Sequence, residues 1–238
     1  MNETYRLVEL VPGFYVIEEQ AVRMFLLVGS EEAVLIDTGF GGGDLKAFLQ
    51  QVCPVPVTRV INTHADIDHL GCNHQFEPIL MHPAEFDRYT NGGKRAAEGL
   101  IPLWEGDRIA VGDYTLEVIL IPGHTPGSIA LLEREKRFLI SGDSVQDDAI
   151  FMFGAGRNMP ALIRSVEKLE GLSGCFDVIY PSHGSLTVTP DVLPKLKRGA
   201  LDVMAGQVEG QPPIWEGMPC KLYDCGGVKF LYDLPEAE

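Results

Sequence analysis

Basic residues are scarce in this sequence. Lys and Arg number 19 against 34 Asp and Glu, which leaves a formal net charge of −15 at pH 7. Proteins that follow a nucleic-acid backbone need many cations to neutralise phosphates, so this balance argues against a nucleic-acid partner. Hydrophobic residues make up 45% of the chain, which is enough to build a large core.

Segments that target or anchor a protein are also absent. Residues 1–6 lack the basic start and the apolar stretch of a signal peptide. No apolar run approaches the length of about 20 residues that a membrane-spanning helix needs. The five cysteines are odd in number and irregularly spaced, so we expect reduced thiols rather than a disulfide framework. These absences predict a cytoplasmic protein with no membrane partner, and they leave its oligomeric state open.

Short strands bounded by Gly and Pro dominate the first part of the sequence. Apolar, β-branched runs predict several strands within residues 5–37, and their close spacing indicates antiparallel hairpins. Residues 45–52 have one apolar face at helical spacing, and Asp44 is placed to cap that helix. Strands and helices then recur in two halves of similar plan. This order favours a layered α/β (α+β) sandwich over a doubly wound sheet.

Four potential metal ligands lie within six residues, from His64 to His69. The preceding residues 57–62 predict a buried strand, and residues 70–73 predict the opening of a helix. Ligands on a strand-to-helix loop lie at the carboxyl edge of a sheet, where α/β folds leave a crevice. Two histidines and two carboxylates suit a divalent first-row metal, and a pair of metals in particular. A solvated acidic loop is the alternative.

A predicted buried strand ends beside a residue of metal-ligand type at five points along the chain. These residues are Asp37, His64, His124, Asp143 and His183. If the strand ends share one edge, their side chains converge. A dinuclear hydrolytic site needs His nitrogens and carboxylate oxygens on each metal, a bridging ligand and open positions for water and substrate. The pattern therefore predicts such a site.

These motifs resemble the metallo-β-lactamase superfamily. The family pattern is His-x-His-x-Asp-His, followed by separate His, Asp and His motifs, with an Asp-Thr-Gly type of segment upstream. This chain has His64-Ala-Asp66-Ile-Asp68-His69, Gly123-His124, Gly142-Asp143 and Ser182-His183-Gly184, with Asp37-Thr38-Gly39 upstream. The resemblance implies a four-layer αββα sandwich, a single metallo-β-lactamase-like domain over residues 1–238, and a metal site among the loops at one edge.

The resemblance also implies roles for individual residues. Asp37 would orient a ligand or nearby backbone without binding metal. Metal-bound hydroxide would attack a carbonyl or similar centre, and Asp68 would help to steer or accept a proton. The metal ligands would be His64, Asp66 and His124 for one ion, Asp68, His69 and His183 for the other, and Asp143 as the bridge.

Asp66 departs from the family pattern, in which His is usual at this position. Its arm is shorter than that of His, and with Asp68 and Asp143 it contributes three negative charges. An anionic, oxygen-rich shell favours harder metals. We therefore expect two divalent metal ions, zinc first, with iron or manganese as alternatives. The first site should bind zinc more weakly than a three-histidine site, or prefer iron or manganese.

The least regular segments, 87–105, 144–159 and 210–232, are expected to form the rim of the site. Phe151 and Phe153 are candidates to line an apolar substrate pocket, with packing of the loop as the alternative. Arg157 is a candidate to meet an anionic group, with simple solvation as the alternative.

The absent export signal disfavours a β-lactam substrate, and the acidity disfavours RNA. We expect a hydrolase of a small-molecule ester, thioester or lactone. An iron-dependent oxidoreductase of the flavodiiron or persulfide-dioxygenase kind is the alternative on the same fold, and a non-catalytic metal-binding or partner-binding module is the third reading.

Overall fold

The computed structural model describes residues 4–93, 95–213 and 217–233 of the chain. Its internal contacts divide the chain into two compact units. Unit 1 comprises residues 1–119 and 131–136, and unit 2 comprises residues 120–130 and 137–238. The expectation of one domain over residues 1–238 stays a prediction.

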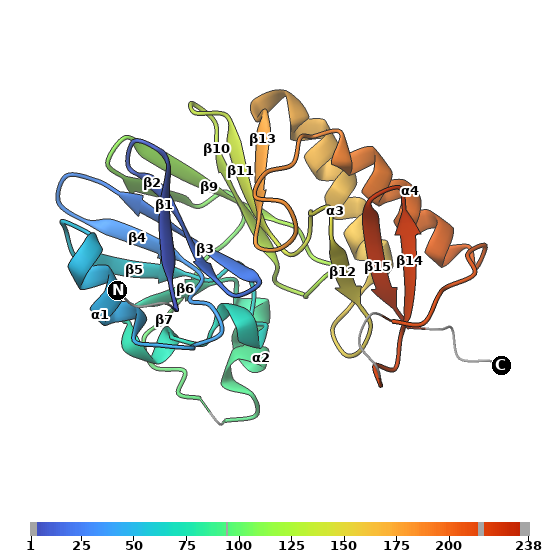
Figure 1. Cartoon of the computed structure of the whole chain (residues 1–238), viewed down its shortest axis with the longest axis horizontal. Coiled ribbons are helices and arrows are strands. Elements are labelled where there is room, and N and C mark those ends of the chain that lie inside the picture. The colour runs from blue at the N-terminus through green and yellow to red at the C-terminus, as the bar shows by residue number, and fades with distance from the viewer. Residues whose placement is uncertain (1–3, 94, 214–216, 234–238) are drawn as a thin grey trace. The chain divides into compact units, whose positions relative to one another are not determined.

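A seven-stranded sheet forms the centre of unit 1 (Figure 1). Its first four strands pair antiparallel as the hairpin spacing predicts, and its last four pair parallel. In spatial as well as chain order the strands are β1 (Arg6–Val11), β2 (Phe14–Glu19), β3 (Val22–Val28), β4 (Ala33–Ile36), β5 (Val57–Ile61), β6 (Ile79–Met81) and β7 (Leu100–Pro102). Because β4 and β5 are parallel, the residues that follow them emerge at the same edge of the sheet.

Helix α1 (Leu45–Val52) connects β4 to β5, as the apolar spacing predicts. The Asp44 side chain accepts a hydrogen bond from the Ala47 amide at 2.9 Å and so caps the helix. Leu45 and Leu49 are buried in a core that also contains Leu26 and Leu35 of the sheet. Burial of this face fixes α1 against the sheet, and with it the chain entering β5.

The predicted helix opening at residues 70–73 is wrong. The end of the ligand loop forms one turn of 3₁₀ helix, η1 (Ile67–His69), and the segment after the loop forms a second, η2 (Asn73–Gln75). Its backbone amides bond to the glycine-rich loop after β4 instead of to a helix: Gly71 N–H donates to Gly39 at 2.8 Å, and Cys72 N–H donates to Thr38 at 3.3 Å. Local sequence periodicity does not predict such hydrogen bonds between distant segments.

Unit 2 contains a parallel pair, a small sheet and two helices. β11 (Phe138–Gly142) pairs parallel with β13 (Val178–Pro181). β12 (Ala149–Met152) pairs parallel with β15 (Val228–Tyr232), which forms the predicted closing hairpin with β14 (Lys221–Cys225). Helices α3 (Met159–Leu172) and α4 (Val192–Met204) lie side by side, with α4 beside β14 and β15 (Figure 1).

The expectation that residues 144–159 are irregular is wrong for β12, because that strand takes its partner from residues about 80 positions further along the chain. The expected rim segment 87–105 also contains regular structure, namely the end of α2 (Phe86–Thr90) and strand β7.

Strand β8 (Arg108–Val111) pairs antiparallel with β9 (Tyr114–Leu120), and β10 spans Ile129–Glu133. The boundary between the two units falls within β10. Every residue of β10 and β11 is buried, including the Glu133 carboxylate. That carboxylate accepts hydrogen bonds from the backbone of Thr115 and Lys136, which offsets the cost of burying it.

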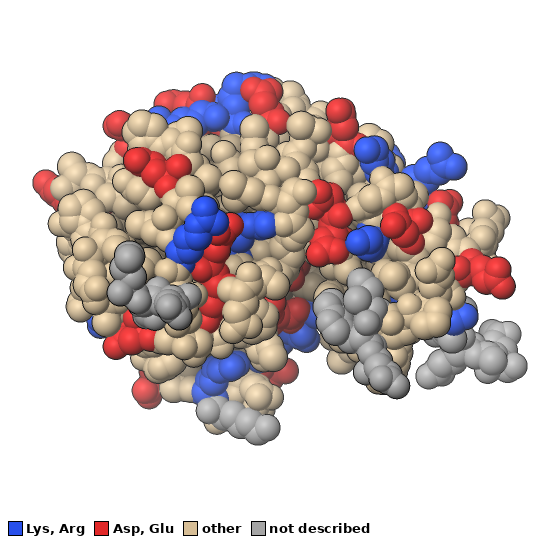
Figure 2. Space-filling model, viewed as in Figure 1, with Lys and Arg blue, Asp and Glu red and all other residues tan. Residues whose placement is uncertain are grey.

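On the face shown in Figure 2, basic and acidic side chains are interspersed, and the basic ones of the described residues form no broad band there. Among the helices of the described residues, none combines the length and the apolar character needed to cross a membrane.

Candidate metal centre

In unit 1, Asp37 and His69 form a buried pair at the edge where β4 ends. The Asp37 carboxylate Oδ2 lies 2.8 Å from His69 Nδ1, and both side chains are almost fully buried. A carboxylate oxygen only accepts, so Nδ1 carries a proton, and in the neutral ring Nε2 is then the nitrogen with the lone pair. Asp37 has φ +62°, a left-handed conformation that Asp and Asn tolerate better than most residues.

His64 is oriented by the same carboxylate through Thr63. Thr63 Oγ1 donates to Asp37 Oδ2 at 2.7 Å and lies 3.0 Å from His64 Nδ1. The hydroxyl has one proton, so it accepts from Nδ1 while donating to Asp37. His64 therefore also presents Nε2 as an acceptor. Asp37 sets the tautomers of both histidines, which is how ligating imidazoles are commonly oriented.

The backbone of the ligand loop is fixed at its middle by a buried acid. Glu85 lies in the 3₁₀ turn η3 (Pro83–Glu85) and is fully buried, and its Oε2 accepts from the Ala65 amide at 2.9 Å. By contrast, Ile67 in the same loop is 73% exposed. Hydrogen bonds, rather than apolar burial of Ile67, therefore hold this loop in place.

Asp66 and Asp68 each place one carboxylate oxygen beside a histidine. Asp66 Oδ2 lies 3.6 Å from His64 Nε2, and Asp68 Oδ2 lies 3.6 Å from His69 Nε2. The other oxygen of Asp66, Oδ1, accepts from Arg88 of α2, whose Nε lies 2.9 Å away. The terminal NH2 group of Arg88 also donates to Oδ1.

In unit 2, His124 follows β9 and is held from two sides. Its Nδ1 lies 3.0 Å from the carbonyl oxygen of Phe151 in β12, which can only accept, so Nε2 is again the acceptor nitrogen. The guanidinium of Arg157 donates to the His124 carbonyl oxygen. Arg157, expected at the substrate, thus contacts the backbone of a candidate ligand.

Asp143 and His183 follow the paired strands β11 and β13, where Gly142 is opposite Pro181. One oxygen, Asp143 Oδ2, lies 3.4 Å from His183 Nε2 and 3.7 Å from His124 Nε2. One carboxylate oxygen of Asp143 thus lies near two imidazole nitrogens, and the bridging role of Asp143 stays a prediction. His183 is the most exposed of these three, at 19% of its side chain.

Among the described residues, four imidazole–carboxylate pairs, two within each unit, have separations between 3.4 and 3.7 Å. They exceed the usual hydrogen-bond length of about 2.7–3.2 Å. Two ligand atoms bound at about 2.0–2.2 Å to one tetrahedral ion lie roughly 3.4 Å apart. The Nε2 atoms of these pairs face carboxylate oxygens at that spacing, and a mixed imidazole and carboxylate donor set suits zinc, iron and manganese. The residues present therefore fit a divalent metal ion.

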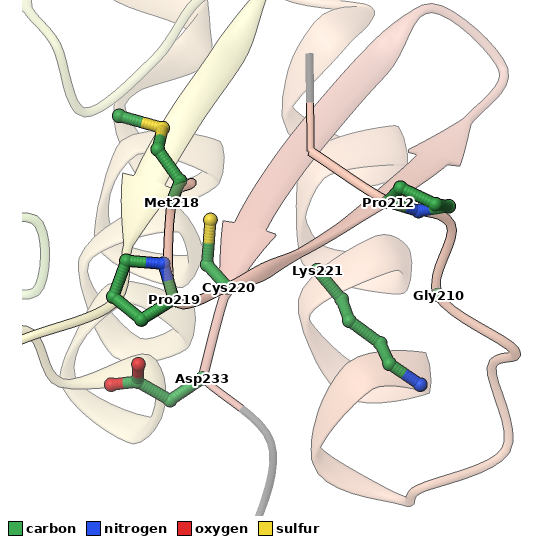
Figure 3. A pocket seen from close by; sticks show the side chains of 7 residues that line it. All are labelled: Gly210, Pro212, Met218, Pro219, Cys220, Lys221 and Asp233. Atoms are coloured by element: carbon green, nitrogen blue, oxygen red, sulfur yellow. The ribbon is translucent and has the colours of Figure 1, made fainter. Parts of the chain in front are cut away.

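Phe151 and Phe153 lie in an apolar cluster of unit 2. Their ring centroids are 5.7 Å apart, and they pack with Met218, Cys220 and Leu231. Two members of this cluster also line a cavity of about 940 Å³, which Figure 3 shows between the segment before β14, the start of β14 and the end of β15. The lining residues are Gly210, Pro212, Met218, Pro219, Cys220, Lys221 and Asp233. None of the candidate metal ligands is among them.

Three residues of this centre were not anticipated from the sequence, namely Thr63, Glu85 and Arg88. Thr63 precedes His64, so a hydroxyl next to a ligand was a usable signal. Glu85 and Arg88 contact residues that lie 20 and 22 positions away in the sequence, and no sequence motif predicts these contacts.

The chain is similar to known proteins of one superfamily. Residues 18–183 match the family described as the metallo-beta-lactamase superfamily. The acyl-coenzyme A thioesterase MBLAC2 of Gallus gallus is 29% identical over 68% of this chain and 72% of its own length. That of Homo sapiens is 26% identical over 76% of this chain and 81% of its own length. A metallo-beta-lactamase structure from Pontibacter korlensis matches with a TM-score of 0.72 at 18% identity, covering 83% of this chain and 99% of that one. The predicted αββα fold is confirmed by these matches.

Proposed function

Because this chain belongs to the metallo-β-lactamase superfamily and is a hydrolase of that superfamily, we propose that it hydrolyses small-molecule thioesters with the help of two divalent metal ions. The likeness of the solved structures supports the fold alone. The thioester class is supported by relatives named acyl-coenzyme A thioesterases, whose similarity extends over most of this chain and of their own.

The proposed ligand assignment is the one that the family pattern implies for this sequence. His64 and Asp66 would act with His124 on one ion, and Asp68 and His69 would act with His183 on the other, with Asp143 between them. Bound divalent ions would supply an activated water and polarise the thioester carbonyl. Within the chain, Asp37 orients both rings, directly at His69 and through Thr63 at His64, so that Nε2 is the ring nitrogen left for a metal, and Asp68 would accept a proton beside His69.

The observation that carries the proposal is the repeated 3.4–3.7 Å spacing between imidazole Nε2 and carboxylate oxygen. Mutually neutralising His–Asp ion pairs would close to hydrogen-bond distance. Instead, the pairs keep the separation of two ligands that share an ion. The same spacing occurs four times, on loops that leave different strands.

The acyl part of the substrate is proposed to lie along the apolar cluster of Phe151, Phe153 and Met218. Phe151 connects this cluster to the metal ligands, because its carbonyl oxygen holds His124 while its ring packs with Phe153. Met218 continues the cluster into the cavity of Figure 3, which has the size of a small-molecule site. Both rings are only partly buried, so they retain surface for contact.

The test measures thiol release from a panel of acyl-coenzyme A and other small thioesters, with lactones, simple esters and phosphodiesters alongside. The metal-stripped protein is reloaded with zinc, manganese or iron(II) in turn. We expect thioesters to be cleaved fastest. Asp143→Asn should lower kcat/KM by at least about a hundredfold, since a ligand matters more than the outer partners whose loss costs ten- to a hundredfold.

Asp177→Asn is the matched control, because this exposed carboxylate of the same unit pairs only on the surface with Arg137. Cleavage of lactones or phosphodiesters but not thioesters would overturn the substrate class. Equal activity of Asp143→Asn and Asp177→Asn would overturn the site. Consumption of oxygen with a persulfide, by iron-loaded protein that cleaves no ester, would select the oxidoreductase alternative.

A further inference from the structure

The carboxylate of Asp66 is shared between an imidazole and a guanidinium. Its Oδ2 lies 3.6 Å from His64 Nε2, while its Oδ1 accepts from both Nε and NH2 of Arg88. Asp66 is 14% exposed and Arg88 35% exposed, so the pair is only partly screened by water. Arg88 thus holds Oδ1, while Oδ2 is the oxygen that faces His64.

We propose that Arg88 is a positioning residue that makes Asp66 a one-oxygen, charge-compensated metal ligand and thereby keeps the first metal site selective for zinc over harder ions. The proposal rests on the proposed function only in that it takes His64 and Asp66 as ligands. It is independent of which bond the enzyme cleaves.

The first part of the argument is geometric. A carboxylate free of partners can bind an ion through both oxygens, as hard cations with large shells prefer. The two donors of Arg88 converge on Oδ1, which fixes the carboxylate plane and leaves Oδ2 as the oxygen beside His64. The loop itself cannot adjust freely, since Glu85 holds the Ala65 amide between these two residues.

The second part is the charge. Relatives with His at position 66 would place a neutral ligand there, whereas Asp adds one negative charge. Arg88 adds one positive charge in direct contact with it, so the pair together is neutral. This cancels part of the shift toward iron or manganese that Asp66 predicts on its own. Arg is suited to this role because it stays charged and its planar fork fixes the carboxylate, unlike the single ammonium of Lys.

The segment that carries Arg88 is built as a support for the loop. Residues 83–90 form η3 and α2 in succession, and they contact the loop at two consecutive residues, through Glu85 at Ala65 and through Arg88 at Asp66. Two charged side chains three positions apart, one in η3 and one in α2, thus contact the same ligand segment.

The test is a metal-competition titration, which does not require activity. A chromophoric chelator is used to measure zinc and manganese affinity of metal-stripped protein in a His183→Ala background, which removes a ligand of the second set. Arg88→Met should raise the ratio of manganese to zinc affinity by about ten- to a hundredfold, the scale of outer-partner effects. Arg88→Lys should give a smaller shift in the same direction, because it keeps the charge and loses the fork.

The matched control is Arg95→Gln, since Arg95 contacts the Tyr89 carbonyl and ring of the same segment. It should leave the ratio unchanged. In an Asp66→His background, Arg88→Met should also leave the ratio unchanged, because the carboxylate through which it acts is gone. A merely structural loss would lower both affinities and not their ratio.

An unchanged ratio in Arg88→Met, or the same shift with and without Asp66, would overturn the proposal. If Arg88→Met does not show the cooperative thermal transition of the parent protein, the affinity ratio of Arg88→Lys is used instead, with the same outcomes. Thioesterase activity is measured separately on the protein with His183 intact. A shifted ratio in the His183→Ala background, together with no thioester cleavage by the protein with His183 intact, overturns the proposed function and supports the role of Arg88.

Discussion

The carboxylate of Asp37 accepts a hydrogen bond from Nδ1 of His69 at 2.8 Å, with both groups buried at the end of β4 and its neighbouring loop. The same carboxylate also accepts from the Thr63 hydroxyl and the Thr63 amide. Every one of these neighbours is a donor in this arrangement. Asp37 therefore acts as an all-acceptor group that orients two candidate ligands.

Asp37→Asn should lower metal affinity by about ten- to a hundredfold. Asn tolerates the left-handed backbone at this position, so the change tests the side chain rather than the turn. However, its amide nitrogen must face either the Thr63 amide or the His69 ring, and both present donors. The measurement is chelator competition on metal-stripped protein.

Asp44→Asn is the control for Asp37→Asn, because Asn also caps a helix well and this carboxylate lies outside the centre. Metal affinity that drops equally in both variants would contradict the role of Asp37.

Thr63→Val should weaken metal binding, while Thr63→Ser should stay close to the parent. Val keeps the shape of Thr but removes the hydroxyl that contacts both Asp37 and His64. His64 then loses the acceptor that fixes its proton on Nδ1, and the other tautomer turns an N–H toward the metal position. Metal titration of both variants checks this. A full-affinity Thr63→Val protein would show that His64 is oriented by other contacts.

The candidate ligands could be picked out from the sequence because each lies next to a strand end or within one short motif, and their binding of metal stays a prediction. His64, Asp143 and His183 are examples in which local pattern and position at a sheet edge agree. The contacts that tune them are of another kind. Arg88 meets Asp66 only because η3 and α2 fold back over the loop, and β12 exists only because β15 pairs with it. Such nonlocal partners leave no period or spacing in the sequence.

Cys72 is expected to be the slowest of the cysteines in the described part of the chain to react with iodoacetamide. Burial raises the pKa of its thiol, and the hydroxyl of Tyr5, 3.5 Å from Sγ, is the main opposing contact. A raised pKa leaves less of the reactive thiolate at pH 8. Peptide mass spectrometry should find alkylation of Cys72 at least about tenfold slower than of the partly exposed Cys175.

Unfolding in guanidinium is the control for the cysteine experiment, because it should remove the difference between Cys72 and Cys175. Equal rates in the native protein would contradict the buried placement of the thiol between Tyr5 and the glycine loop.

Gly71→Ala should destabilise the protein by about 1–3 kcal/mol, in the range of overpacked sites. A Cβ at this position would lie 2.2 Å from the Phe40 carbonyl carbon and 2.3 Å from the Gly41 nitrogen. Both are backbone atoms, so the clash must separate the ligand loop from the loop after β4. That separation breaks the bond from Gly71 N–H to Gly39 and loosens the approach of His69 to Asp37.

Urea unfolding measures this loss, with Gly174→Ala as the control because a Cβ there would have no atom within 4 Å from residues beyond its local backbone. In Gly71→Ala, metal affinity and stability should both drop. In the control, neither should change. The reason is that the backbone contact between Gly39 and Gly71 holds the Asp37 carboxylate beside His69. A variant that is destabilised yet binds metal as tightly as the parent would show that Asp37 and His69 keep their contact without this close packing.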